Sequence, residues 1–213
     1  MTDAGPTLRR ELVVATGNPG KCAEMEQILQ GCGIRILTMA HFSDQPFEPD
    51  ETGCTYMENA EIKALAACRM TGRVCVADDA GLEIDALDGV PGVYSRRFLG
   101  EDTPFPAKMA RILEMLRDVP DEQRGCRFRA AVAIAIPDGA VIGCHGICEG
   151  RIGHEQRGTF GFGYDPIFLV PGLGKHMAEL TPEVKHGISH RGQALARARE
   201  ALAVLFDTVP PEG

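Results

Sequence analysis

The sequence predicts an α/β fold: an elongated, two-lobed molecule around a mixed, twisted β-sheet with flanking helices and a central substrate cleft. Two observations carry this prediction. Strand and helix patterns alternate in the order βαβαβ over residues 12–77, and the pattern then changes to strands joined by short turns, as in hairpins. No composition shift marks a linker, so we expect one domain of two lobes over 11–210, after a disordered leader over 1–10.

Composition narrows the classes of function. Of the 213 residues, 44% are hydrophobic and 24% are charged, as in soluble globular proteins with a sizeable core. The net charge of −8 argues against a broad nucleic-acid-binding surface but permits a small anionic ligand in a locally basic pocket. No apolar stretch is long enough to cross a bilayer, and no secretory signal begins the chain. We therefore expect no nucleic-acid partner and no membrane.

The eight cysteines are expected to be reduced core residues, because a chain without a secretory signal does not point to a disulfide framework. No CxxC spacing is present, which argues against a structural zinc site. The chain has no tryptophan, so nothing in it suggests aromatic stacking on single-stranded nucleic acid.

The first structural unit is an apolar strand over 12–15, followed by a tight glycine loop and a lysine that opens a helix. Such a loop presents free backbone N–H groups and the positive end of a helix dipole, which together bind phosphate. An ordinary βα turn has the same composition, and no GxxxxGK[ST] motif is present. The loop consists of Thr16, Gly17, Asn18, Pro19, Gly20 and Lys21.

The next elements follow from apolar spacing. A helix is expected over 21–30, with one apolar face, and Gly31 ends it. A strand over 34–38 and a polar stretch to Gly53 come next. Thr55 and Glu58 form a capping box that starts an alanine-rich helix ending near Met70.

Asn59 and Lys63 stand four residues apart on this second helix and share a face. A short buried strand over 74–77 follows the helix, and we expect Asp78 and Asp79 to end it.

The second half of the chain reads as hairpins and short helices. Thr103 is expected to cap a helix with Pro104 at its first position. Strands are expected over 127–136 and 140–145, joined by a turn, and over 167–170. A short helix starts at 181–183, and a long final helix begins at Ser189.

The first candidate for chemistry is the pair of adjacent acids Asp78 and Asp79. Neighbouring residues of a strand point to opposite faces, so we expect one acid to face the cleft and the other to brace either the turn or the residues that surround the site. Carboxylate oxygens of this kind suit Mg²⁺, and Glu51 could supply another. The alternatives without a metal are that Asp78 and Asp79 form a solvated turn and that Glu51 is an ordinary acid of a loop.

Two further clusters lie near the C-terminal end. Glycines flank the aromatic residues of the stretch GFGYDP (161–166), so a ring could lie over a ligand, and Asp165 could accept from a base or ribose donor. Lys185 precedes a helix start with His190 and Arg191, which is suited to reading an anion or a base edge. A packed aromatic turn and a solvated cap are the alternatives.

Together these clusters supply cations at Lys21, Lys63, Lys185 and Arg191, and acids at Glu51 and Asp79. A triphosphate carries about four negative charges and needs such surroundings. The sum predicts a nucleoside triphosphate site with Mg²⁺.

With these motifs in hand, the chain resembles the inosine triphosphate pyrophosphatase family, whose members are also called dITP/XTP pyrophosphatases. The resemblance covers nearly the whole chain, in the family's order. The matching stretches are TGNPGK (16–21), ETGCTYMENAEIKA (51–64), VADDAGLEIDAL (76–87), GVPGVYSRRF (89–98), GTFGFGYDPIF (158–168) and AELTPEVKHGISHRGQAL (178–195).

The resemblance implies hydrolysis of inosine, deoxyinosine or xanthosine triphosphate between the α and β phosphates, which cleanses the nucleotide pool. It also implies a cytoplasmic homodimer that requires Mg²⁺. Carried over by motif, residues 16–21 hold the phosphates, Asp79 is the general base and a metal ligand, and Glu51 is a second metal ligand. The residues implied to contact the nucleotide are Phe162, Gly163, Tyr164, Asp165, Lys185, His190 and Arg191.

Two positions depart from the family's pattern. Ala80 follows the two aspartates where the family has serine, so only a backbone N–H could contact substrate there. One lost hydrogen bond is worth about 0.5–1.5 kcal/mol, so we expect weaker binding and the same reaction. His186 and Gly187 replace a pair of small residues, with no clear consequence.

Two alternatives stay open from the sequence. One is a pyrophosphatase of another nucleotide, as in the septum-formation (Maf-like) proteins of similar fold. The other is a nucleotide sensor that does not hydrolyse its ligand, against which Asp79 and Glu51 speak.

Overall fold

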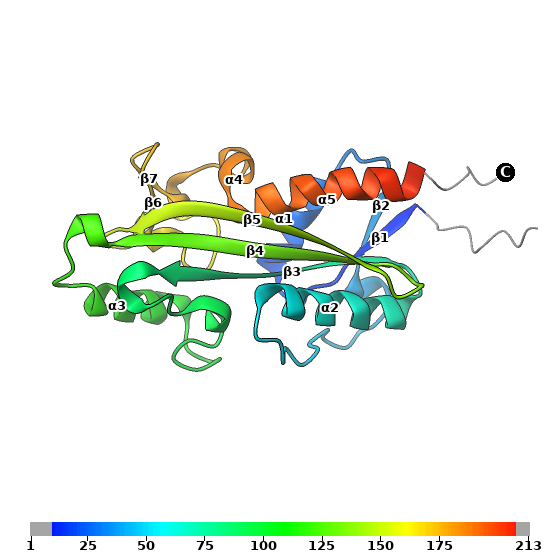
Figure 1. Ribbon diagram of the computed structural model, residues 1–213, viewed down its shortest axis with the longest axis horizontal. Coiled ribbons are helices and arrows are strands. Elements are labelled where there is room, and N and C mark those ends of the chain that lie inside the picture. Colours follow the sequence, from blue (N-terminus) through cyan, green and yellow to red (C-terminus); the bar gives the residue numbers. More distant parts are fainter. Residues whose placement is uncertain (1–9, 208–213) are drawn as a thin grey trace, which may run out of the picture. The chain divides into compact units, whose positions relative to one another are not determined.

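The protein is a mixed α/β fold built on one sheet of seven strands, in the order β2-β1-β3-β4-β5-β6-β7 (Figure 1). The computed structural model describes residues 10–207. Strand β1 pairs in parallel with β2 and β3, whereas β6 pairs antiparallel with β5 and β7, which confirms the mixed sheet. The strands are β1 (Glu11–Val14), β2 (Arg35–Thr38), β3 (Val74–Ile84), β4 (Gly125–Ala135), β5 (Val141–Ile152), β6 (Phe168–Val170) and β7 (Lys175–His176).

Five α-helices flank these strands within the described residues: α1 (Pro19–Leu29), α2 (Tyr56–Thr71), α3 (Phe105–Met115), α4 (Pro182–Ile188) and α5 (His190–Asp207). No helix of the described residues is long and apolar enough to cross a membrane. The leader expected over 1–10 lies outside the described residues, apart from Arg10.

The described chain divides into two compact units. The first comprises the chain up to Asp79, Ala131–Cys144 and the chain from Ala194 onward, and the second comprises Ala80–Ala130 and His145–Gln193. The expected arrangement of two lobes around a cleft stays a prediction.

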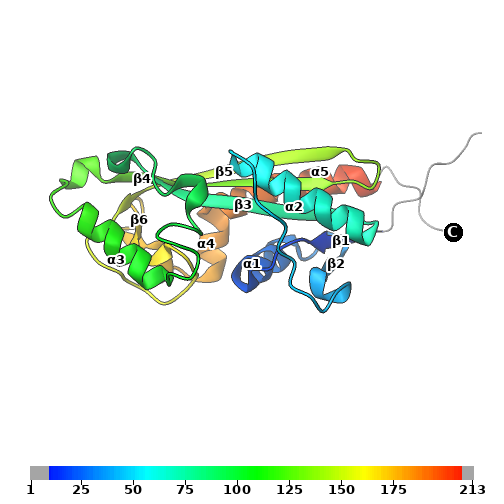
Figure 2. The same ribbon diagram turned by 90° about the horizontal axis from the view of Figure 1, so that it is seen from below.

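The core cluster between α2 and the sheet in the first unit is built largely from alanine. Ala60, Ala64 and Ala67 follow one face of α2 and are fully buried against Cys75 and Ala77 of β3. Helix α2 runs alongside β3 in both ribbon views (Figure 1 and Figure 2). Because these side chains are small, the helix lies close to the sheet, and the longer side chains of Asn59 and Lys63 on α2 reach Asp79 of β3.

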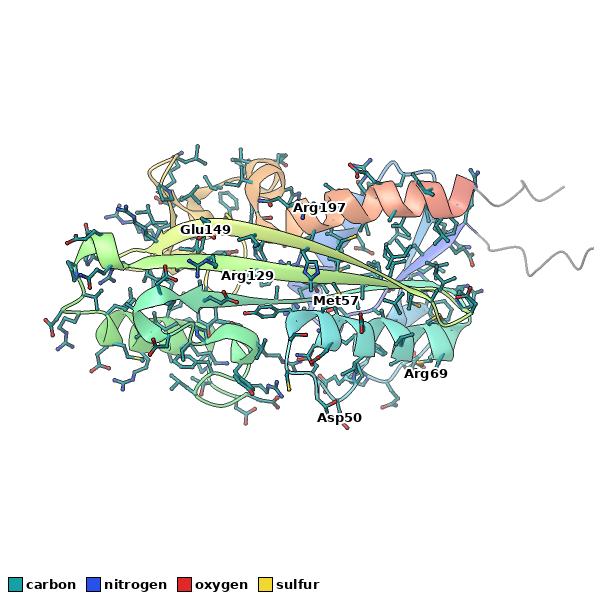
Figure 3. The ribbon with its side chains drawn as sticks, viewed as in Figure 1. Asp50, Met57, Arg69, Arg129, Glu149 and Arg197 are labelled. Carbon is teal, nitrogen blue, oxygen red and sulfur yellow. The ribbon has the colours of Figure 1, made fainter. Side chains whose placement is uncertain are left out.

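The core of the second unit contains larger side chains and is partly aromatic. It joins Leu82 and Ile84 of β3 with Ile112 of α3 and with Phe128 and Phe168. The solvent side of these strands is charged: Arg127 bonds Asp85 at 2.8 Å and Glu149 at 3.1 Å, and Arg129 bonds Glu83 at 2.8 Å. Figure 3 labels Arg129 on β4 and Glu149 on β5. Exposed ion pairs of this kind contribute little stability each, so the apolar side holds the unit together.

The buried side chain of Arg124 links the end of α3 to the end of β5. The guanidinium of Arg124 is 2% exposed and donates to the backbone carbonyls of Leu116 at 2.6 Å, Ile152 at 2.9 Å and Gly153 at 2.7 Å. Burial lowers the pKa of Arg124 from its ordinary value. Multiple carbonyl acceptors satisfy the donors of the buried charge.

The expected end of the third strand at Asp78 and Asp79 is wrong. Strand β3 continues through both acids to Ile84, eleven residues in all. Lys21 and Lys63 pair with these carboxylates inside the fold, so the acids can be buried without ending the strand. Strand β5 likewise extends to Ile152, beyond the expected end at 145.

Two helix starts also differ from the predictions. Helix α1 begins at Pro19 rather than Lys21, with Asn18 as its N-cap. Thr103 does not cap α3, because its hydroxyl donates to the Leu99 carbonyl at 2.6 Å and the helix begins at Phe105. The capping box of α2 is confirmed: Thr55 accepts from the Glu58 backbone, and Glu58 accepts from the Thr55 backbone.

The close approach of α2 to the sheet can be tested by substitution. Ala64→Leu adds three carbons where the side chain is fully buried, so we expect the free energy of unfolding to fall by about 1–3 kcal/mol. Urea denaturation followed by circular dichroism measures the change. Ala110→Leu, at an exposed position of α3, is the control, and equal behaviour of the two variants would contradict the packing.

Candidate active site

The glycine loop that precedes α1 is more self-contained than the sequence suggests. The side-chain carbonyl of Asn18 accepts from the backbone N–H of Gly20 at 2.9 Å and of Lys21 at 3.1 Å, and the Thr16 hydroxyl accepts from Asn18 N–H at 3.1 Å. The expectation of free N–H groups at Gly20 and Lys21 is therefore wrong for this structure. Pro19 has no N–H to offer, so the dipole and the Lys21 ammonium remain as the loop's positive features.

Gly17 lies where the loop meets another segment of the first unit. A Cβ atom at this position would stand 3.0 Å from the Phe47 carbonyl oxygen, closer than ordinary contact. The residue is exposed on its other side, as are Asn18 and Pro19. The loop therefore presents backbone rather than side chains to solvent at Gly17.

Asp78 and Lys21 form the first buried contact of the site. The Lys21 ammonium lies 3.2 Å from the Asp78 carboxylate and 3.5 Å from the Asp78 backbone carbonyl. The Asp78 side chain is fully buried, whereas that of Lys21 is 16% exposed. The acid thus holds the lysine at the loop, and the lysine side chain stays partly exposed.

Asp79 is the centre of a second buried group. Its carboxylate accepts from the Asn59 amide at 3.1 Å and from the Lys63 ammonium at 3.4 Å, and Lys63 also donates to Glu51 at 2.8 Å. Asn59 is fully buried, and its carbonyl accepts from Gly53 N–H at 2.8 Å. The shared helix face of Asn59 and Lys63 is confirmed, and Lys63 joins two acids from distant parts of the sequence.

The pKa values of this group reflect burial and neighbouring charge. Burial raises the pKa of Asp79 above its ordinary value; Lys63 and Lys21 oppose the rise, while Glu51 and Asp78 add to it. Burial alone would lower the pKa of Lys63, but the charges of Asp79, Asp78 and Glu51 raise it overall. A carboxylate with a raised pKa is a better proton acceptor than a solvated one, and perturbed groups of this kind are common at catalytic sites.

The donors that could hold a metal are the carboxylates of Glu51 and Asp79, which both contact Lys63. No cluster of three or more histidine, cysteine or acidic residues arranged for a metal occurs among residues 10–207. This set does not fit a closed protein cage, but it fits Mg²⁺, which is commonly held by one or two carboxylates together with substrate phosphates and water.

The second unit brings together a separate group of predicted residues. Lys185 and Asp165 form an ion pair at 2.5 Å with both side chains 4% exposed. The same Asp165 oxygen accepts from Phe162 N–H at 2.9 Å, and the Lys185 ammonium lies 4.9 Å from the Phe162 ring centroid. Asp165 thus fixes Phe162 and Lys185 together, a role that the sequence analysis did not assign to it.

Arg191 and His190 begin α5 beside this group. The Arg191 guanidinium lies 5.3 Å from the Phe162 ring centroid. Arg191 and Lys185 therefore both make cation–π contacts with this ring. Ser189 separates α4 from α5, and its hydroxyl accepts from Gly192 N–H at 3.0 Å. A side chain at Gly192 would overlap the His186 carbonyl, so glycine is needed for this tight junction.

Three of the residues predicted to contact the nucleotide lie outside these groups of charged side chains. Tyr164 is a core residue, 3% exposed, whose hydroxyl donates to the Ser95 carbonyl at 2.9 Å and whose ring meets Phe105 edge-on. Ala80 lies on β3 directly after Asp79 and is half-buried. Gly163 adopts a φ of 66°, which glycine reaches without strain.

Sequence reasoning missed Asn59 and understated Asp78. Asn59 was placed on the Lys63 face but given no role, although its amide is one of the two donors that the structure places on Asp79. The spacing of four residues from Lys63 was the available signal. Of the two roles expected for the second acid, Asp78 has that of supporting a neighbouring residue, Lys21, and not a turn.

Comparisons with known proteins agree on one family. The model of the Ham1 family matches residues 12–201. The chain is 47% identical over 196 residues to a dITP/XTP pyrophosphatase of Exiguobacterium sibiricum, covering 92% of this chain and 98% of that protein.

Two solved structures resemble the fold. The Ham1 protein of Coxiella burnetii has a TM-score of 0.81 and 41% identity, covering 91% of this chain and 98% of that one. A nucleoside-triphosphatase / dITP/XTP pyrophosphatase of Mycobacterium abscessus has a TM-score of 0.69 and 41% identity, covering 88% and 98%.

The ion pair of Asp165 and Lys185 requires glycine, which has no side chain, at position 161. A Cβ at Gly161 would overlap the Asp165 carboxylate, and the backbone there has a φ of 74°. We expect Gly161→Ala to lower the free energy of unfolding by about 1–3 kcal/mol through strain and displacement of the pair. Chemical denaturation measures it. Gly187→Ala in α4, where a Cβ meets no neighbour, is the control and is expected to be neutral or stabilising; an unchanged Gly161→Ala variant would contradict the packing.

Proposed function

The chain belongs to the Ham1 family, and we propose that it hydrolyses nucleoside triphosphates of deaminated purines, such as ITP, dITP and XTP, to the monophosphate and pyrophosphate. The hydrolysis of a phosphoanhydride bond agrees with the names of its relatives, which match over most of the chain. The observation that carries the proposal is Asp79, a buried acid with a raised pKa held by Asn59 and Lys63 beside Glu51.

We propose Mg²⁺ as the cofactor, held by Glu51 and Asp79. When bound, the ion supplies positive charge to the phosphate oxygens and offsets the charge that develops as the anhydride breaks. The support is the chemistry of the two carboxylates, since oxygen ligands suit Mg²⁺ and phosphates complete its coordination.

Asp79 is the proposed general base. Its carboxylate would orient a water molecule for in-line attack and accept its proton, and its raised pKa favours that transfer. Asn59 holds one carboxylate oxygen at 3.1 Å and so limits rotation of the group. A fixed carboxylate loses less freedom on reaching the reactive geometry.

Lys21 and Lys63 are the proposed stabilisers of the departing pyrophosphate. Each ammonium contacts an acid before substrate is bound: Lys21 lies 3.2 Å from the buried Asp78, and Lys63 lies 2.8 Å from the half-buried Glu51. These acids position the two positive charges before substrate arrives, which is the preorganisation that makes electrostatic catalysis effective. The loop over 16–21 adds its helix dipole.

Base choice is assigned to the second unit. Phe162 offers a ring for stacking, and Lys185, His190 and Arg191 offer donors for a purine edge with a 6-oxo group. Adenine presents an amino donor at that position, so the donors of the site would be left unpaired and adenine nucleotides rejected. With alanine at position 80, only the backbone N–H is available there to the substrate.

We extend the proposal to a homodimer in the cytoplasm on the resemblance of the motifs. The family match and the names of the relatives favour deaminated purines over the nucleotides of septum-formation proteins. The buried acid group around Lys63 argues against a sensor that binds without hydrolysis, because holding a nucleotide does not need it.

The role of Asp79 predicts a large loss of turnover on substitution. Asp79→Asn keeps the shape of the side chain but removes the charge and the proton acceptor, so we expect kcat for ITP to fall by about a hundredfold or more. Pyrophosphate release from ITP measures it. Asp44→Asn, at an exposed position of the first unit, is the control. Near-normal turnover by Asp79→Asn would refute the assignment.

Metal removal tests the proposed cofactor. We expect excess EDTA to lower pyrophosphate release from ITP by at least about a hundredfold, since phosphate charge would go unbalanced, and excess Mg²⁺ to restore it. The same assay with saturating Mg²⁺ throughout is the control. Undiminished release in EDTA would show that the reaction needs no divalent ion.

A further inference from the structure

Three aromatic rings stack in sequence inside the second unit and end at His190. The Phe168 and Phe128 rings lie 4.4 Å apart between centroids, inclined by 23°. The Phe128 and His190 rings lie 4.7 Å apart, inclined by 19°. We call these three residues the aromatic column; they come from β6, β4 and the first residue of α5.

The column is buried along its whole length. Phe168 is fully buried, and Phe128 and His190 are each 5% exposed. Nearly parallel rings at this separation leave the imidazole little room to tilt about its side-chain bonds. The plane of the His190 ring is therefore set by Phe128, a residue 62 positions earlier that the proposed chemistry does not use.

The far end of the column is fixed by a glycine. A Cβ at Gly150 of β5 would overlap the Phe168 ring and would stand 2.8 Å from the Leu169 carbonyl oxygen. The ring thus occupies the space that a side chain at Gly150 would take. A methyl group there would displace the Phe168 ring, which is stacked on Phe128, and the atoms nearest to it belong to Phe168 and Leu169.

The near end of the column meets the residues assigned to the base. Arg191 follows His190 in the first turn of α5, is 2% exposed, and has its guanidinium 5.3 Å from the Phe162 ring. Because the two residues share that turn, a shift of His190 also shifts Arg191. Phe128 lies in the second unit, whereas the acids and lysines assigned to the phosphates belong to the first.

We propose that Phe128 is a positioning residue that sets base specificity, by holding His190, and with it Arg191, in the orientation that distinguishes a 6-oxopurine from adenine. This inference rests on the proposed function. Hydrogen-bond discrimination depends on the direction of the donors, so a small tilt costs selectivity before it costs stability. Turnover of the bound triphosphate depends on other residues and should be affected less.

The test compares kcat and KM for ITP and for ATP in the wild type, Phe128→Leu, Phe128→Tyr and Gly150→Ala. We expect Phe128→Leu and Gly150→Ala to lower the preference for ITP over ATP about tenfold, mainly by raising KM for ITP. Phe128→Tyr keeps the ring and should retain most of the preference. Gly172→Ala, where a Cβ meets no neighbour, is the control.

A merely structural role would give a different result: both nucleotides would lose equally, or kcat would fall while the preference stayed. Either outcome overturns the inference. A wild type that releases no pyrophosphate from ITP would instead refute the proposed function. An active wild type with an unchanged preference in Phe128→Leu and Gly150→Ala refutes only the role of Phe128.

A second measurement does not depend on turnover. In proton NMR the ring hydrogens of His190, assigned with His190→Gln, should be shifted upfield by the stacked Phe128 ring. We expect that shift to be lost in Phe128→Leu and kept in Phe128→Tyr, with circular dichroism showing both variants folded. An identical His190 signal in Phe128→Leu would overturn the inference.

Discussion

The fold depends on burying two consecutive carboxylates, Asp78 and Asp79, within strand β3. A buried charge costs several kcal/mol unless a partner of opposite charge and good geometry meets it. Because strand residues alternate in direction, the two acids need partners on opposite faces of the sheet. Lys21 comes from α1 for Asp78, and Lys63 with Asn59 comes from α2 for Asp79. The position of both helices is therefore tied to this one pair of acids, and the alanine face of α2 permits the approach that the lysine and the amide require.

The same constraint makes the group suited to phosphate chemistry. The cluster of Glu51, Lys21, Lys63, Asp78 and Asp79 contains three acids and two lysines, so one negative charge is left over when all are ionised. A divalent cation that enters with a triphosphate offsets about half of its four negative charges, which lowers the repulsion between the phosphates and the acids. Charges that the protein has already oriented cost no reorganisation during the reaction. The second unit follows the same rule on a smaller scale, since Asp165 fixes Lys185 and the backbone of Phe162.

Features that depend on residues close in sequence were predicted correctly, whereas features that depend on contacts between distant residues were not. The capping box of α2, the shared face of Asn59 and Lys63, and the change from parallel to antiparallel strands are encoded over a few residues, and the structure confirms them. The length of β3 was missed, because polar residues end a strand unless partners from elsewhere in the sequence bury them. The motif over 16–21 predicts free N–H donors, but it does not show that the Asn18 side chain accepts from two of them. The aromatic column joins residues far apart in the sequence, and no spacing rule finds it.

The most direct test of this mechanism is to determine which phosphorus atom receives the oxygen of the attacking water. With Asp79 activating water and Lys21 and Lys63 receiving the departing pyrophosphate, the oxygen of water must end on the α phosphorus. Hydrolysis of ITP in water enriched in oxygen-18, followed by mass spectrometry of the products, reads this out. The account predicts one heavy oxygen in inosine monophosphate and none in pyrophosphate. Inosine diphosphate with orthophosphate, or label in the pyrophosphate, would contradict it.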